Sequence, residues 1–117
     1  MKLIKIQELL EAKVLTGEYD PEIEIEIGCS SDLMSEILAY GKPNSVLLTS
    51  LNNIQVINTV NVADIKVVCF VMGKIPNENM INLAKKNNIT VFITKLTTFE
   101  SCGRLYKNGL KSCSYLD

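Results

Sequence analysis

The sequence predicts a single α/β domain with a mostly parallel β-sheet flanked by helices, and three observations support this. Its 117 residues suit one domain, and 47% of them are hydrophobic, which is enough for one core. Three short apolar runs follow one another at residues 45–49, 65–72 and 89–94. The second and third barely alternate, as expected when helices cover both faces of a parallel sheet. Helical periodicity lies between and after the runs, over lengths that suit one crossover helix each.

The N-terminal third departs from this regular pattern. The spacing of Leu3, Ile6, Leu9 and Leu10 predicts a short amphipathic helix at the N-terminus. Glutamate and isoleucine then alternate strictly over residues 22–27. This alternation predicts an acidic edge strand, with isoleucines on a buried face and glutamates on a face that discourages pairing with other sheets.

Capping and breaking residues mark the predicted helix ends. Ser31 and Asp32 can cap a helix that follows the alternating strand, and Pro76 suits the first turn of a later helix. Thr97 and Glu100 have the spacing of a capping box. The apolar stripes expected to face the core are, helix by helix, Leu33, Met34, Ile37 and Leu38; Ile54, Ile57 and Val60; Met80, Leu83 and Ala84; and Phe99, Cys102, Tyr106 and Leu110.

The predicted domain covers residues 1–111, and residues 112–117 are expected to form a C-terminal tail that carries Cys113. No apolar run approaches the ~18 residues that span a bilayer, and charge returns directly after Met1, unlike in a signal peptide. A cytoplasmic protein with reduced cysteines and no membrane contact is therefore expected. Cys29, Cys69 and Cys102 are interpreted as packing residues.

Composition excludes several functions. A net charge of −1 argues against nucleic-acid binding. The absence of histidine removes the commonest general base, and neither a P-loop nor Gly-x-Gly-x-x-Gly occurs. No two cysteines have Cys-x-x-Cys spacing, so neither a metal site nor a cofactor is expected. Residues 1–40 carry nine acidic and three basic side chains, whereas residues 41–117 carry nine basic and four acidic ones. This asymmetry favours self-association, or simply marks a solvated acidic edge.

The turns that follow the strands are the candidate site. Ligands of open α/β sheets bind beyond the carboxyl ends of the strands, and here four such turns lead into predicted helix N-termini. Hydroxyls, a carboxylate and two lysines gather there, which suits an anion. The alternative is that each polar residue only caps its own helix. The candidate ligand-binding residues are Ser31, Asp32, Thr49, Ser50, Lys74, Lys95 and Thr97.

Three stretches carry a resemblance to the DRTGG domain family. They are residues 31–39, 45–51 and 94–100, and the similarity runs from about Lys2 to Lys111. The last stretch also resembles the N-terminal domain of HPr kinase/phosphorylase, whose catalysis lies in a separate P-loop domain. The sequence lacks Asp-Arg-Thr-Gly-Gly itself, and Thr49-Ser50-Leu51 stands where many members have a Thr-Gly pair. The resemblance implies an α/β domain that accompanies nucleotide-sensing CBS domains in some pyrophosphatases, and that dimerises in small stand-alone members.

Three functional hypotheses follow. The first is a non-catalytic regulatory module that binds an adenine nucleotide or another anionic metabolite at the strand ends or at a homodimer interface. The second is a structural module that docks a cytosolic protein partner and binds no small molecule. The third is an enzyme that uses Asp32 with Lys74 or Lys95 as acid and base, which requires these side chains to meet in one pocket.

Overall fold

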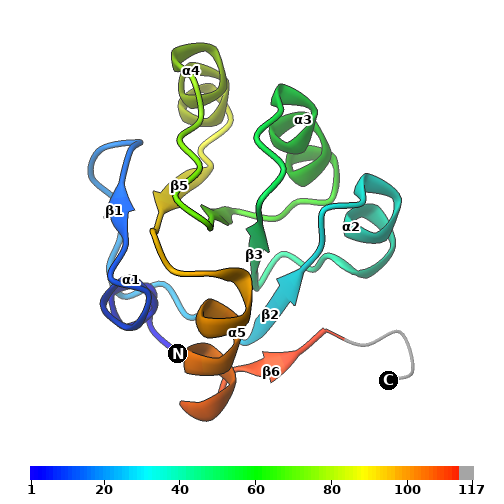
Figure 1. The fold of residues 1–117 in the computed structure, drawn as a ribbon. Coiled ribbons are helices and arrows are strands. Elements are labelled where there is room, and N and C mark those ends of the chain that lie inside the picture. The colour runs from blue at the N-terminus through cyan, green and yellow to red at the C-terminus, as the bar shows by residue number, and fades with distance from the viewer. Residues whose placement is uncertain (114–117) are drawn as a thin grey trace.

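In the computed structural model, which describes residues 1–113, a sheet of six strands lies between two layers of helices (Figure 1). The strand order is β1-β5-β4-β3-β2-β6. Strands β2 to β5 run parallel, β6 is parallel to β2, and β1 is antiparallel to β5. In chain order the elements are α1 (Leu3–Leu9), β1 (Lys13–Val14), β2 (Ile27–Ser30), α2 (Met34–Tyr40), β3 (Ser45–Thr49), α3 (Ile54–Val62), β4 (Val67–Phe70), α4 (Glu78–Lys86), β5 (Thr90–Ile93), α5 (Thr98–Lys107) and β6 (Lys111–Ser112).

Both faces of the central strands are buried, which confirms the predicted α/β class. Leu47 and Val68 pack with α2, α3 and α4 on one face, whereas Val46 and Val67 pack with α1 and α5 on the other. Neighbouring residues of one strand therefore belong to two different cores. This explains why the sequences of β3, β4 and β5 are almost continuously apolar, since neither face can tolerate charge.

The last helix carries the chain back across the sheet. After β5, α5 crosses the face that α1 also covers, and β6 then pairs with β2, so that Lys111 lies opposite Ile27. The sheet thus extends one residue beyond the predicted domain end. Cys113 packs against the core, which corrects the expectation that it lies in a loose tail. Residues 114–117 of that tail lie outside the described residues. Within the described chain, no helix is long and apolar enough to cross a membrane.

The predicted acidic edge strand over residues 22–27 is wrong. Only a single bridge forms there, between Glu24 and Lys2, and β2 begins at Ile27. The segment hydrogen-bonds to the start of the chain: Leu3 N–H donates to Ile23 O, and Ile25 N–H donates to Met1 O. The alternation correctly predicts that Ile25 is buried, but pairing with the N-terminus and with β6 removes β2 from the edge.

Three predicted helix stripes point partly to solvent, and in α3 the exposed member is Ile54. Phe99 and Tyr106 of α5 are 87% and 72% exposed, while Ser101 and Leu105 are buried instead. At α2, Leu33 just before the helix and Leu38 within it are likewise exposed, and the one buried residue of the helix is Ile37. A spacing of three to four residues fits either of two adjacent helix faces. Which face is buried depends on the tertiary crossing of the helix over the sheet.

Candidate ligand-binding site

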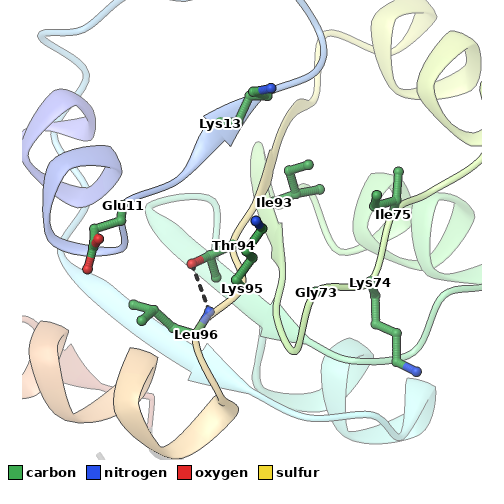
Figure 2. Close-up of a pocket in the computed structure, with 9 residues that line it drawn as sticks. All are labelled: Glu11, Lys13, Gly73, Lys74, Ile75, Ile93, Thr94, Lys95 and Leu96. Carbon is green, nitrogen blue, oxygen red and sulfur yellow. Dashed lines mark hydrogen bonds between the residues drawn. The ribbon is translucent and has the colours of Figure 1, made fainter.

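A cavity of about 500 Å³ opens where β4 and β5 end (Figure 2). Because β1 is antiparallel to β5, the beginning of β1 reaches the same edge of the sheet, and Lys13 lies opposite Ile93. The cavity is therefore formed by the turn before β1 and β1 itself, together with the segments that follow β4 and β5. The lining residues are Glu11, Lys13, Gly73, Lys74, Ile75, Ile93, Thr94, Lys95 and Leu96.

Backbone hydrogen bonds hold the two turns of the cavity together. Met72 N–H donates to Leu96 O at 2.8 Å, and Gly73 N–H donates to Thr94 O at 3.0 Å. The Thr94 hydroxyl donates to Leu10 O at 2.6 Å and accepts from Leu96 N–H at 3.2 Å. Both residues of the first turn have positive φ, 63° at Met72 and 70° at Gly73. A glycine supplies one of these conformations without strain, and the fixed turns give the cavity a defined shape.

The cavity carries an excess of positive charge. Lys13 lies in β1, whereas Lys74 and Lys95 lie in the turns that follow β4 and β5. No ion pair involves any of the three within residues 1–113. The single carboxylate of the lining, Glu11, is paired with Arg104 at 2.6 Å. Acidic groups therefore do not neutralise these lysines. An anion placed in the cavity would be attracted by the ammonium groups of Lys13 and Lys95, and by that of Lys74 after rotation of its side chain.

The wall between the lysines is apolar. Ile75, Ile93 and Leu96 contribute side chains to the cavity, and Ile75 is largely exposed. Figure 2 shows the side chain of Lys74 extending away from Ile93 and Lys95, with its ammonium group at the far end. The flexible stem allows that ammonium group to turn inward toward a ligand. The cavity thus combines cationic groups with an apolar surface on which a planar ring could lie.

Asp32, Thr49 and Ser50 form a separate cluster where β2 and β3 end. The Thr49 hydroxyl donates to Asp32 Oδ1 at 2.7 Å, Ser50 N–H donates to the same oxygen at 2.8 Å, and the Ser50 hydroxyl donates to Asp32 Oδ2 at 2.7 Å. Asp32 thus reaches across to β3 instead of capping α2, which has no side-chain cap. None of the three residues lines the cavity of Lys13, Lys74 and Lys95, which is called the lysine cavity below.

The hydrogen bonds to Asp32 make a pH-dependent contribution to stability. Partial burial acts to raise the pKa of this carboxyl, but the hydrogen bonds from Ser50 and Thr49 outweigh it and lower the pKa below its ordinary value of 3.8. Because the pKa is lower in the folded state, the ionised Asp32 carboxylate stabilises the fold at pH values above the unfolded-state pKa. This stabilisation is lost as the pH falls below about 4.

We expect Asp32→Ala to lower the free energy of unfolding at pH 7 by about 1–2 kcal/mol, because it removes three hydrogen bonds. Urea unfolding at pH 7 and pH 3 measures this, and the deficit should shrink at pH 3. Glu18→Ala serves as the control, since Glu18 is exposed, lacks a left-handed backbone, and has a carboxylate that makes no hydrogen bond or ion pair within residues 1–113. An equal deficit at both pH values would contradict the assignment.

Thr97 and Ser31 take up local roles. Thr97 Oγ1 accepts from Glu100 N–H at 3.1 Å and so caps α5, which is one half of the predicted capping box. The other half is not formed, because Glu100 Oε1 accepts from Arg104 Nε–H instead. Ser31 Oγ accepts from Leu33 N–H at 3.0 Å and donates to Glu36 Oε1 at 2.8 Å. The hydroxyl of Thr97 therefore caps a helix and that of Ser31 stabilises a turn, so local structure explains both residues. Two asparagines, Asn53 and Asn77, cap α3 and α4 in the same way.

The structure therefore does not bring the seven predicted site residues together in one site. Lys74 and Lys95 line one cavity, and Asp32, Thr49 and Ser50 form a hydrogen-bonded cluster outside it. An amide links the intervening turns, since Asn52 Nδ2 donates to Ile75 O at 2.9 Å. Lys13 and Glu11 were missed because no sequence signal gives the direction of a two-residue strand. Within residues 1–113, no group of three or more acidic or cysteine side chains could hold a metal ion.

The fold has a counterpart among solved structures. No protein-family model matches the sequence, and a search of curated proteins gives no match. The chain is similar to the crystal structure of the CBS and DRTGG domains from the regulatory region of Clostridium perfringens pyrophosphatase, complexed with the activator diadenosine tetraphosphate. The TM-score is 0.71 at 16% identity, over 99% of this chain and 52% of the other. The chain thus spans about half of that structure, and the likeness establishes its fold, in agreement with the DRTGG resemblance.

Proposed function

We propose that this chain is a regulatory module without catalytic activity, which binds an adenine nucleotide or another small anionic metabolite in the lysine cavity. The observation that carries the proposal is the meeting of Lys13, Lys74 and Lys95 around one cavity, with no acidic partner in the described residues. Phosphate groups would interact with the ammonium groups, and a base would lie against Ile75 and Ile93.

The structural neighbour supports a regulatory role. That protein is the regulatory region of a pyrophosphatase, and its crystals contain an activator composed of two adenosines joined by four phosphates. A ligand with phosphates and planar bases matches the cationic and apolar character of the cavity in this chain. The enzymatic alternative has less support, because the Asp32 carboxylate accepts hydrogen bonds from Thr49 and Ser50 and does not line the cavity with the lysines.

The first experiment is a thermal-shift screen of the purified chain with ATP, AMP, diadenosine tetraphosphate and inorganic phosphate. A ligand at about 100 times its Kd should raise the free energy of unfolding by about 2.7 kcal/mol. Calorimetric titration then compares the wild type with Lys13→Gln and Lys95→Gln. Each variant should bind about tenfold more weakly, because one charge-assisted hydrogen bond is lost.

The matched control is Lys85→Gln on α4, since Lys85 is exposed and lies outside the cavity. It should bind as the wild type does. Equal weakening by all three variants would indicate a general charge effect rather than a site, and no stabilisation by any anion would refute the ligand proposal.

A docking module without a small ligand is the second candidate, and α5 supplies the observation that favours it. Phe99 and Tyr106 are exposed on this helix, and Gly103 between them has open space around it. Aromatic side chains are enriched in protein interfaces, so this surface would pair with a second copy of the chain. A dimeric mass in sedimentation equilibrium, together with no response to any anion, would favour docking over ligand sensing.

A further inference from the structure

The far edge of the sheet brings two cysteines together. Gly28 of β2 lies opposite Ser112 of β6, so the next pair in the parallel register is Cys29 and Cys113. Cys113 N–H donates to Gly28 O at 3.1 Å, which continues this pairing. Adjacent strands lie about 4.8 Å apart, within the Cα separations of about 4.4–6.8 Å that a disulfide spans.

The two thiols lie on the same face of the sheet. Cys29 belongs to the core under α2, and Cys113 packs against that same core. Both line a cavity of about 170 Å³ beside α2, through which a small oxidant could approach. Cys102, in contrast, projects from α5 and packs with the core on the opposite face. Register and face therefore select one pair among the cysteines.

A glycine permits this close approach. A Cβ placed on Gly28 would lie 3.0 Å from Leu110 Cδ2, which is tighter than ordinary van der Waals contact. Leu110 is itself buried between α5 and the sheet. Because position 28 has no side chain, the chain that leaves α5 can lie directly against β2, and this brings Cys113 beside Cys29.

We propose that Cys29 and Cys113 are a redox pair that forms a reversible intramolecular disulfide under oxidation by a peroxide. In the first step hydrogen peroxide oxidises the Cys113 thiol to a sulfenic acid and is reduced to water. In the second step the Cys29 sulfur attacks the sulfenic sulfur, the S–S bond forms, and the hydroxyl leaves as a second water with the Cys29 proton. A dithiol reductant reverses the reaction.

The order of the two steps follows from exposure. Cys113 is partly exposed, whereas Cys29 is 7% exposed. Burial, and to a lesser degree the neighbouring Cys113 thiol, raises the pKa of Cys29 far above its ordinary value. Because the thiolate is the nucleophile, a thiol with a raised pKa reacts slowly with free peroxide. Cys29 can still resolve the sulfenic acid, because its fixed position beside Cys113 gives the small ionised fraction a high effective concentration. The bond would fix β6 to β2, at the opposite edge of the sheet from the lysine cavity.

Peptide mapping of the full chain tests this inference. The reduced protein is treated with hydrogen peroxide, blocked with an alkylating reagent and digested with trypsin, which places each of the four cysteines in a separate peptide. The expected product is a monomer about 2 Da lighter, with the peptides of Cys29 and Cys113 joined. Its melting temperature should exceed that of the reduced protein, because the cross-link closes a long loop.

The variants separate this pair from general thiol oxidation. Cys113→Ser should abolish both the mass loss and the rise in melting temperature, and its partial exposure makes it the safer change than Cys29→Ser in the core. Cys102→Ser should leave both unchanged. A linkage to Cys102, cross-linked dimers alone, or over-oxidised Cys113 without a cross-link would each overturn the inference. Anion titration of the oxidised chain should match that of the reduced chain, so this proposal and the ligand proposal can fail separately.

Discussion

Phe92→Ala is expected to lower the free energy of unfolding by about 4 kcal/mol, since it deletes a large buried ring and leaves a cavity behind. Phe92 is fully buried in β5, between β1 and β4. Its ring packs against Tyr19 with centroids 5.4 Å apart and an interplanar angle of 72°. Such edge-to-face pairs add a further favourable contribution beyond the buried area.

This substitution should also affect the candidate site, because Phe92 directly precedes the cavity residues Ile93 to Lys95. Urea unfolding measures the loss, and the control is Phe99→Ala, which removes a ring that is 87% exposed. The control should change stability by less than about 0.5 kcal/mol. Similar losses in the two variants would contradict the observed division between buried and exposed aromatic rings.

Gly41→Ala is expected to cost about 2–3 kcal/mol, although alanine suits the backbone at this position. Gly41 has a φ of −66°, so no left-handed conformation requires glycine. The new Cβ would lie 2.6 Å from the carbonyl oxygen of Ile37 and 2.6 Å from Cδ1 of Ile65. The Ile37 carbonyl already accepts the Gly41 N–H at 2.9 Å, so it cannot move without disturbing the end of α2. Ile65 is fully buried, so it cannot move without disturbing the core. The expected loss of stability is the cost of placing an extra methyl group in a space that is already filled.

Gly103→Ala is the matched control for Gly41→Ala, and it should have the opposite sign. Gly103 lies inside α5, and a Cβ placed there meets no heavy atom within 4 Å. Alanine in a helix interior is favoured over glycine by about 0.5–1 kcal/mol. Thermal or urea unfolding of both variants should therefore show one destabilised and one stabilised protein. Destabilisation by both changes would show that α5 packs against something at Gly103.

Much of the fold was predictable because it follows from burial on both faces. The apolar runs at residues 45–49, 65–72 and 89–94 contain β3, β4 and β5, and the helices between them follow from spacing. The N-terminal helix is also observed as α1. Local capping was predictable in part: Thr97 accepts from Glu100 N–H, but the Glu100 carboxylate accepts from Arg104 and does not complete the capping box. Each of these signals depends on residues a few positions apart.

The exposed faces and the edges were less predictable. The spacing that groups Phe99 with Tyr106 fits two adjacent faces of α5, and only the crossing of this helix over the sheet buries Ser101 instead. The alternation over residues 22–27 gave the burial of Ile25 correctly. It could not reveal that the backbone would pair with the N-terminal residues rather than with a strand.

By itself, the sequence determined the α/β class, the central strands and the presence of lysines at the strand ends. Only the tertiary structure placed Lys13 in the cavity with Lys95, directed Asp32 to Thr49 and Ser50, and set Cys29 beside Cys113. These contacts depend on the antiparallel direction of β1 and on the return of α5 across the sheet. Both are fixed by packing between residues far apart in the chain. Local periodicity depends only on residues a few positions apart, so it cannot predict such long-range packing.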